Sequence, residues 1–257
     1  MGLQYGIKEV LNLSIVDYAT NKPVLYSDYA AVSSNANTAE RLKIKGGWGN
    51  VDQLSFDHSR ESTINVTMPL VDLKAVAMLT GEDLVTGASD IFKREVLVVA
   101  ADNTVKLSAA PLANSLFVAD LAGVRDYGKE ITLGSATPAA GQYAINDKVI
   151  SLNATSHPEG SEIVVTYLYA SATTAKKISI RGNKFPKAVK IYGTGLARNQ
   201  EDEKDYPVHV TVHKARPQAN FTFTMEGTNA TNLEIVFDTF TVVDTEGHQQ
   251  LVDYVFE

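Results

Sequence analysis

Residues 63–81 read TINVTMPLVDLKAVAMLTG, and the hydrophobic period changes within this stretch. Apolar and polar residues alternate over Thr63–Met68, which is the period of a β-strand with one solvated face. From Pro69 onward the residues are almost continuously apolar until Gly81. Because proline favours the first turn of a helix and glycine favours its end, we predict a short helix over Leu70–Leu79.

The expected helix is apolar around nearly its whole circumference, and only Asp72 and Lys74 interrupt it. A helix with this pattern is covered on more than one side. A single sheet covers one side only, so a second layer or another subunit has to cover the other side. This is the first indication of a protein that assembles.

The composition is that of an ordinary globular protein, with 257 residues, 44% hydrophobic and 21% charged. The absence of cysteine excludes disulfides, thiolate zinc sites and a cysteine nucleophile. The net charge of −7 argues against a nucleic-acid-binding surface, because neutralising phosphates requires clustered Lys and Arg. We expect neither a membrane span nor a signal peptide, since no sufficiently long apolar run and no basic N-terminal head are present.

Alternation predicts several strands in the first hundred residues. A hairpin is expected to join Leu11–Ile15 to Val24–Tyr26, and further strands are expected at 41–46, 62–68 and Arg94–Ala100. The segment Ala30–Thr38 is small and polar and has no period, so we predict an irregular surface segment that is mobile in a free monomer.

Residues 101–174 have short apolar runs divided by proline and glycine, with few charges. Within them, Gln142–Ile145 and Lys148–Leu152 predict a hairpin, and Glu162–Tyr169 predicts a central strand. Strands at this spacing are typical of a small sandwich. We therefore predict two domains: a discontinuous host domain, residues 1–100 and 175–257, and an inserted β-sandwich domain, residues 101–174.

The host domain is expected to resume with five strands, at Lys177–Arg181, Ala188–Tyr192, Tyr206–Lys214, Asn220–Met225 and Leu233–Val243. The predicted fold class is therefore mainly β. It consists of an antiparallel β-sandwich or barrel with one short α-helix, together with the inserted small β-sandwich domain.

No catalytic, cofactor-binding or metal-binding residues are predicted. His209 and His213 have the spacing of a metal pair on a helix, but on a strand they stand roughly 13 Å apart, too far for one zinc ion. Asp57-His58-Ser59 places triad residue types in a row, whereas a triad is assembled in space. Gly46–Asn50 precedes no helix that could bind phosphate, so we interpret it as a flexible turn. That turn displays Trp48, which is either packed under a loop or an anchor at an interface.

Two charged segments receive ordinary interpretations. Glu201–Asp205 is interpreted as a solvated loop, because it lacks the alternating ligands and the glycine of a calcium loop. Six basic residues between Lys176 and Lys190 would form a one-sided face if they lay on strands. Such a face could complement an acidic neighbour as readily as a nucleic acid.

Taken in order, these elements resemble phage tail tube proteins. The matching features are the N-terminal hairpin, a strand pair ending in Ser62–Met68, the apolar Leu70–Leu79 helix with its Thr80-Gly81 end, and a final meander with the edge Val208–Ala215. The resemblance covers residues 1–100 and 175–257, and the segment 101–174 is additional to it. It implies rings, usually of six subunits, whose sheets join into a continuous β-barrel around a DNA-conducting lumen. The negative net charge fits such a lumen, because an acidic wall would not hold passing DNA.

The predicted function is therefore structural: a virion protein of the phage tail tube that self-assembles into stacked, hexameric rings and conducts DNA during ejection. The expected partners are further copies of the chain and other tail proteins, with no cofactor, no specific DNA binding and assembly in the bacterial host cytoplasm. The protein is predicted not to be an enzyme. The alternatives are a tail terminator, a baseplate ring, a capsid decoration protein or a carbohydrate-binding β module. The candidate assembly residues are Leu70, Leu73, Val76, Ala77, Trp48 and Val32.

Overall fold

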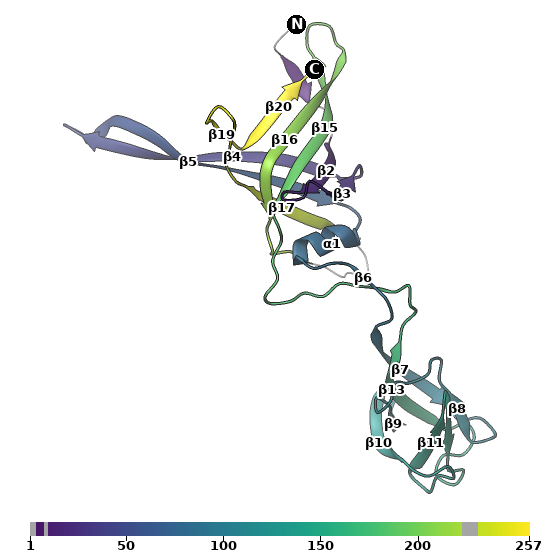
Figure 1. Ribbon diagram of the computed structural model, residues 1–257. Helices are drawn as coiled ribbons and strands as arrows, with labels where there is room; N and C mark the ends of the chain where they lie inside the picture. Colours follow the sequence, from purple (N-terminus) through teal and green to yellow (C-terminus); the bar gives the residue numbers. More distant parts are fainter. Residues whose placement is uncertain (1–3, 8–9, 223–230) are drawn as a thin grey trace. The chain divides into compact units, whose positions relative to one another are not determined.

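The computed structural model describes residues 4–7, 10–222 and 231–257, and its sheets are almost entirely antiparallel. The predicted fold class is confirmed, because the described chain is mainly β with one short helix. The chain divides into two compact units (Figure 1). Unit 1 comprises Met1–Leu84 and Ile178–Glu257, and unit 2 comprises Val85–Lys177.

Unit 1 contains α1 and a nine-stranded sheet. Seven strands follow the order β3-β2-β15-β16-β17-β5-β4, while β1 pairs with β15 and β20 pairs with β16. A separate two-stranded ribbon is formed by β18 and β19. The elements are β1 Tyr5–Ile7, β2 Asn12–Asp17, β3 Pro23–Ser27, β4 Val32–Gly46, β5 Val51–Met68, α1 Leu73–Thr80, β15 Val189–Asn199, β16 Asp205–Pro217, β17 Leu233–Thr239, β18 Val242–Val243, β19 Gln249–Gln250 and β20 Val252–Phe256.

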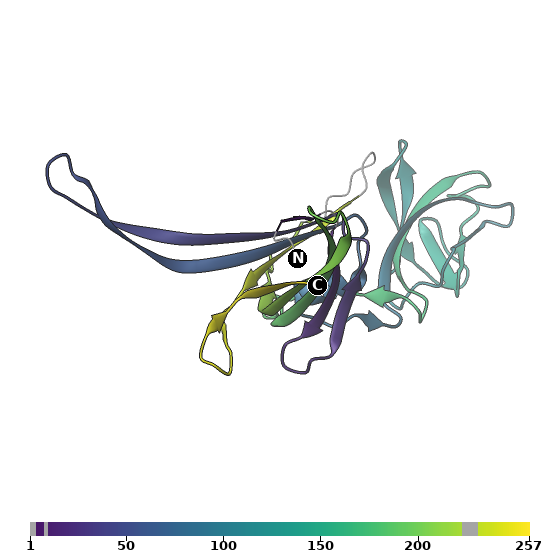
Figure 2. The same ribbon diagram turned by 90° about the horizontal axis from the view of Figure 1, so that it is seen from above.

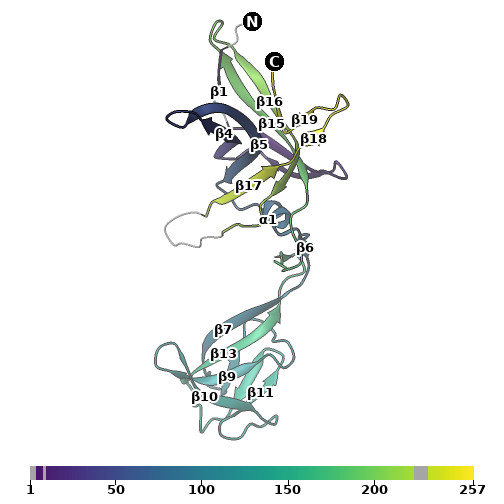
Figure 3. The same ribbon diagram turned by 90° about the vertical axis from the view of Figure 1, so that its left-hand side faces the viewer.

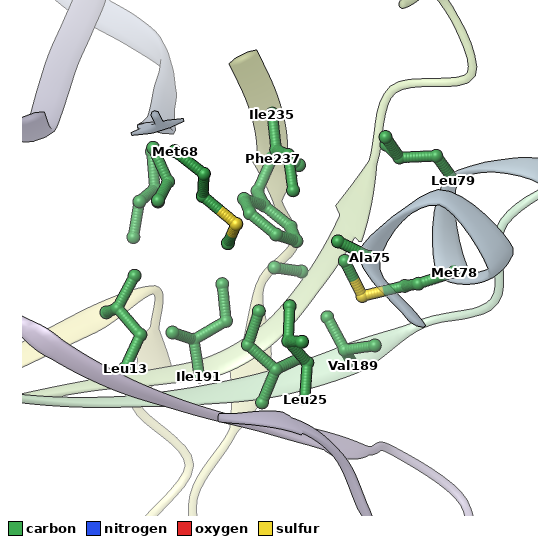
Figure 4. Close-up of a cluster of buried hydrophobic side chains, with 14 of the residues drawn as sticks. Leu13, Leu25, Met68, Ala75, Met78, Leu79, Val189, Ile191, Ile235 and Phe237 are labelled. Atoms are coloured by element: carbon green, nitrogen blue, oxygen red, sulfur yellow. The ribbon is translucent and has the colours of Figure 1, made fainter. Parts of the chain in front are cut away.

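The core of unit 1 is formed by alternate residues of the sheet and by one side of α1 (Figure 4). Ile191, Ile235 and Phe237 are each at most 1% exposed and come from strands that are far apart in the sequence. From the helix, Ala75 and Leu79 join the same cluster. The period of two along the strands and the apolar helix side therefore meet in one core, as alternation requires.

Helix α1 begins at Asp72 as its N-cap and ends at Gly81. The Asp72 carboxylate accepts a hydrogen bond from the Lys74 backbone N–H at 2.7 Å, which satisfies one of the free donors of the first turn. Gly81 has φ +69°, and a Cβ at this position would collide with the backbone of Phe185. The helix starts three residues later than predicted, because Asp72 provides an N-cap that Pro69 cannot.

The prediction of an irregular segment over Ala30–Thr38 is wrong from Val32 onward. Residues from Val32 onward form β4, which pairs along its length with β5, for example Ser33 with Val66 and Asn35 with Ile64. The small polar side chains carry no strand period, but their backbone groups are satisfied by the regular neighbouring strand. Cross-strand pairing of this kind is not visible in a local pattern.

Unit 2 is a seven-stranded sheet in the order β7-β13-β9-β10-β11-β12-β8, together with the short pair β14-β6 (Figure 3). Strand β13 lies between β7 and β9, as predicted for a central strand. The predicted hairpin is also present, with Tyr143 opposite Leu152 and Asn146 opposite Val149. The elements are β6 Val85–Thr86, β7 Asp90–Val98, β8 Thr104–Lys106, β9 Phe117–Ala122, β10 Asp126–Leu133, β11 Gln142–Asn146, β12 Val149–Leu152, β13 Glu162–Ala170 and β14 Lys176–Lys177.

The boundaries of unit 2 lie outside the predicted limits of 101 and 174. The strand expected at Arg94–Ala100 in the host is β7, and all nine of its residues pair with β13. Its exposed face and its clear alternation resemble those of the host strands, so the sequence did not show where it pairs.

Two strands predicted after the inserted segment are largely not formed in the described residues. Of Lys177–Arg181, only Lys177 is in a strand. Three of the six basic residues between 176 and 190, Arg181, Lys184 and Lys187, lie in an irregular segment, so the six do not form one strand face. Of Asn220–Met225, residues 220–222 are not in a strand, and 223–225 lie outside the described residues.

The two ends of unit 2 lie side by side, because Val85 pairs with Lys177 and Thr86 pairs with Lys176. Paired Cα atoms of antiparallel strands are about 5 Å apart, a distance that a few residues span. We therefore expect that replacing Thr86–Lys176 with a short Gly/Ser linker leaves unit 1 folded, with a cooperative thermal transition by circular dichroism. Loss of cooperative unfolding in both the shortened chain and the isolated segment 85–177 would show that the two units depend on each other.

Candidate assembly surface

Strands β4 and β5 continue far beyond the rest of unit 1 as a two-stranded hairpin (Figure 2). We call residues 40–60 the arm. Every residue of the arm is exposed except Gly46, which is partly buried. The arm begins at an irregularity in the pairing between Thr38 and Glu40, where Ser59 has φ 50°. Bulges of this kind bend a strand and increase its twist, so the irregularity marks where the hairpin leaves the sheet.

One face of the arm is apolar. Leu42 pairs with Phe56 and Ile44 pairs with Leu54, so the four side chains share a face by the alternation of the pleat. Their exposed fractions lie between 46% and 56%, and nearby Val51 is 54% exposed. In the described part of the chain, no other element covers this face.

The opposite face of the arm is charged and paired. The Arg41 guanidinium contacts the Asp57 carboxylate at 2.6 Å, and the Lys43 ammonium contacts Asp52 at 2.7 Å. The hydrogen bond from Arg41 lowers the pKa of Asp57. Exposed ion pairs contribute little to stability. The arm therefore has one charged face, which water solvates well, and one apolar face, which water solvates poorly.

Trp48 lies at the tip of the arm and is fully exposed. The turn that carries it contains Gly47, Gly49 and Asn50, all with positive φ. Of the two predicted interpretations, packing under a loop is wrong for the described chain. A single exposed tryptophan at the end of a projecting hairpin has the properties of an interface anchor.

A second exposed apolar group surrounds the start of α1. Leu70, Val71 and Leu73 are 65%, 39% and 42% exposed, and we call these three residues the helix-start patch. Ala77 is partly buried, whereas Val76 is only 5% exposed and belongs to the core. The apolar circumference seen in the sequence is thus divided between a buried side and this patch.

The sequence therefore named residues at both surfaces, Trp48 in the arm and Leu70 and Leu73 in the helix-start patch. The backbone of Val32 pairs with Thr67 at the base of β4, and its side chain lies outside what the structure describes. Most of the apolar arm residues were not singled out. Their signal was the alternation of Leu42 and Ile44 with lysines, repeated by Leu54 and Phe56 in the following strand.

The residues considered for catalysis or metal binding do not form such sites. Asp57 pairs with Arg41 and not with its neighbour His58. His213 contacts Asp253 at 2.8 Å, while His209 lies 3.6 Å from Glu257, so each histidine of β16 has its own carboxylate. Within residues 4–7, 10–222 and 231–257, no three His, Asp or Glu side chains come together as metal ligands.

One triad-like combination occurs in unit 2. His157, 6% exposed, has Asp120 at 2.8 Å from Nε2 and Ser156 at 3.0 Å from Nδ1. The Ser156 hydroxyl also donates to the Asn153 carbonyl at 3.3 Å. The arrangement links β9 to the turn that follows β12, which is a structural role.

The chain matches a protein-family model over nearly its whole length. The family model of the YomU/Tube protein family matches residues 5–253, which include both units. The chain belongs to this family. A relative, the SPbeta prophage-derived uncharacterized protein YomU of Bacillus subtilis (strain 168), is 30% identical over 113 residues. The alignment covers 44% of this chain and 42% of the relative, so the chain matches less than half of that protein's length.

Membership of the YomU/Tube family and the prophage origin of this relative support the predicted resemblance at the level of a phage-derived, tube-like family. The family name suggests a structural protein and not an enzyme. No helix in the described part of the chain has the length and apolar character needed to span a membrane.

Proposed function

We propose that this protein is a structural subunit of a phage tail tube, which self-assembles into stacked, hexameric rings around a DNA-conducting lumen. The observation that carries the proposal is the arm of residues 40–60, whose apolar face is uncovered in the described chain. In a monomer, this long hairpin leaves its apolar face exposed to water. Contact with a second copy buries the face, and the free energy of that burial stabilises the assembly.

The magnitude is sufficient for association. Five apolar side chains of the arm are about half exposed. Covering the rest of each contributes on the order of 1 kcal/mol, so the face contributes several kcal/mol per contact. The edge position of β4 in the sheet adds a row of backbone groups that can pair with another chain.

The chain exposes two different apolar surfaces, the arm and the helix-start patch. We propose that the arm of one copy docks on the helix-start patch of the next, so two different surfaces meet. Contacts between unlike surfaces repeat head to tail and generate a ring when the rotation closes. Each copy in such a ring supplies one arm and receives one arm.

The charge of the chain fits passage of DNA through the proposed lumen. The net charge is −7, and an acidic wall repels the phosphates of a duplex instead of holding them. The other tail proteins, the virion location and assembly in the host cytoplasm belong to the same proposal.

Size-exclusion chromatography followed by negative-stain electron microscopy tests the proposal. We expect large species at high protein concentration, visible as tubes with a regular axial repeat. Single rings that never stack would instead favour a tail terminator or a baseplate ring. A monodisperse monomer at all concentrations, also with tail components added, would contradict a tube.

A further inference from the structure

Unit 2 contains a cleft of about 590 Å³ that the proposed tube function does not use. It is bordered by β10, β11 and the irregular segment 110–116. Strands β10 and β11 are parallel neighbours that share only two pairs, Thr132 with Gln142 and Leu133 with Tyr143. Elsewhere along the sheet the pairing is antiparallel and more extensive. The cleft lies beside this short parallel contact.

Tyr143 brings a polar group to the lining of this cleft. Its side chain is 94% buried, given its exposed fraction of 6%, yet its hydroxyl has no hydrogen-bond partner among the described residues. The residue lines the cleft. Burial raises the pKa of Tyr143 and the negative charge of Glu130 raises it further, so the phenol keeps its proton at neutral pH. The hydroxyl oxygen is not among the fully buried side-chain atoms that lack a partner, so it reaches the surface of the cleft, where it can donate to a ligand.

The rest of the lining limits the chemistry of that ligand. Glu130 and Asp147 supply carboxylate acceptors, and Asn114 and Thr132 supply groups that can both donate and accept. Leu133 provides an apolar wall and is itself 64% exposed. No lysine or arginine lines the cleft, so an anionic ligand would meet two negative charges without a counter-charge.

We propose that this cleft binds a neutral saccharide. Alcohol hydroxyls donate to carboxylates and accept from a phenol, so a sugar satisfies both kinds of group in the lining. Its C–H face can lie against the apolar wall, in the manner of sites that combine apolar walls with a few convergent polar groups. The inference goes beyond the proposed tube function and does not depend on it, because every residue of the cleft lies in unit 2.

Ligand-observed NMR on the full chain tests the site. The probes are three neutral trisaccharides (maltotriose, cellotriose and N,N′,N″-triacetylchitotriose), an anionic trisaccharide (trigalacturonate) and the diamine cadaverine. We expect saturation transfer to at least one neutral sugar at millimolar concentration, and none to trigalacturonate. Tyr143→Phe is expected to weaken that binding about 3- to 10-fold, the effect of one lost hydrogen bond.

Tyr127→Phe is the matched control. Tyr127 is an exposed tyrosine of β10 that does not line the cleft, and its ring meets that of the lining residue Phe117 edge to face, with centroids 6.0 Å apart. Tyr127→Phe keeps this ring contact and removes only a hydroxyl group, so the variant should bind like the parent. Glu130→Gln provides a second test and should also lower the affinity for the neutral sugar. Transfer to cadaverine alone, no transfer to any neutral sugar, or equal affinity of the parent, Tyr143→Phe and Glu130→Gln would each overturn the proposal. Thermal unfolding of each variant checks that unit 2 stays folded.

Discussion

Replacing Leu54 and Phe56 with aspartate is expected to abolish assembly and leave the protomer folded. Both side chains are about half exposed and neither belongs to the core of unit 1. Substitutions at such exposed positions change the free energy of unfolding by about 0.5 kcal/mol or less. In a contact between copies, however, the same aspartates would be buried without a partner, which costs several kcal/mol for each charge.

Because each protomer repeats the contact, we expect the variant to remain monomeric at concentrations where the parent forms large species. The measurement is size-exclusion chromatography with light scattering, and circular dichroism verifies the fold. Ser55→Asp is the matched control: residue 55 lies between the two positions and is on the opposite, charged face, beside Lys43. This variant should assemble. If it fails as completely as the double variant, the effect is one of charge and not of the apolar face.

A mixing experiment separates a contact between unlike surfaces from a symmetric contact. The arm variant keeps an intact helix-start patch, and the double variant Leu70→Asp, Leu73→Asp keeps an intact arm. If the arm docks on the helix-start patch, neither variant assembles alone, and their mixture forms a 1:1 complex that grows no further. A symmetric arm–arm contact gives no such complex, because one arm of each pair is defective.

The sequence predicted most of the fold because most elements carry their own period. The alternation in β16 and in β5 up to Met68, the helix and the hairpin of β11 and β12 are all local patterns. The predictions failed where pairing across the sheet decides the conformation. Residues 32–38 have no period and still form β4, because β5 offers a regular partner. Strand β7 has a clear period, but only its pairing with β13 shows that it belongs to unit 2.

The same distinction applies to the candidate sites. Trp48 was named because a glycine-rich turn carries it, and Leu70 and Leu73 because the expected helix is apolar around nearly its whole circumference. The apolar face of the arm depends on two strands in register, so a pattern in one strand could not show it. For a related reason, the sequence could not indicate that the Tyr143 hydroxyl lacks a hydrogen-bond partner. Its lack of a partner follows from the packing around it and not from its neighbours in the chain.

The other large effect is expected from Val76→Asp, which should unfold unit 1. Val76 is 5% exposed and lies in the core cluster with the sheet residues that α1 covers. The substitution removes a buried side chain and places an unpaired carboxylate among apolar groups. A loss on the order of 4 kcal/mol or more is expected, which is a large part of the 5–15 kcal/mol that typically stabilises a domain.

Leu73→Asp on the same helix is the control for this substitution. Leu73 is 42% exposed and is the first residue of α1, where a negative charge interacts favourably with the helix dipole. We expect its free energy of unfolding to stay within about 1 kcal/mol of the parent, while assembly is weakened because the helix-start patch has gained a charge. Differential scanning calorimetry of the full chain distinguishes the two effects. Val76→Asp should remove or strongly lower the transition of unit 1 and leave that of unit 2, whereas Leu73→Asp should leave both in place. Equal stability of the two variants would show that Val76 does not lie in the core.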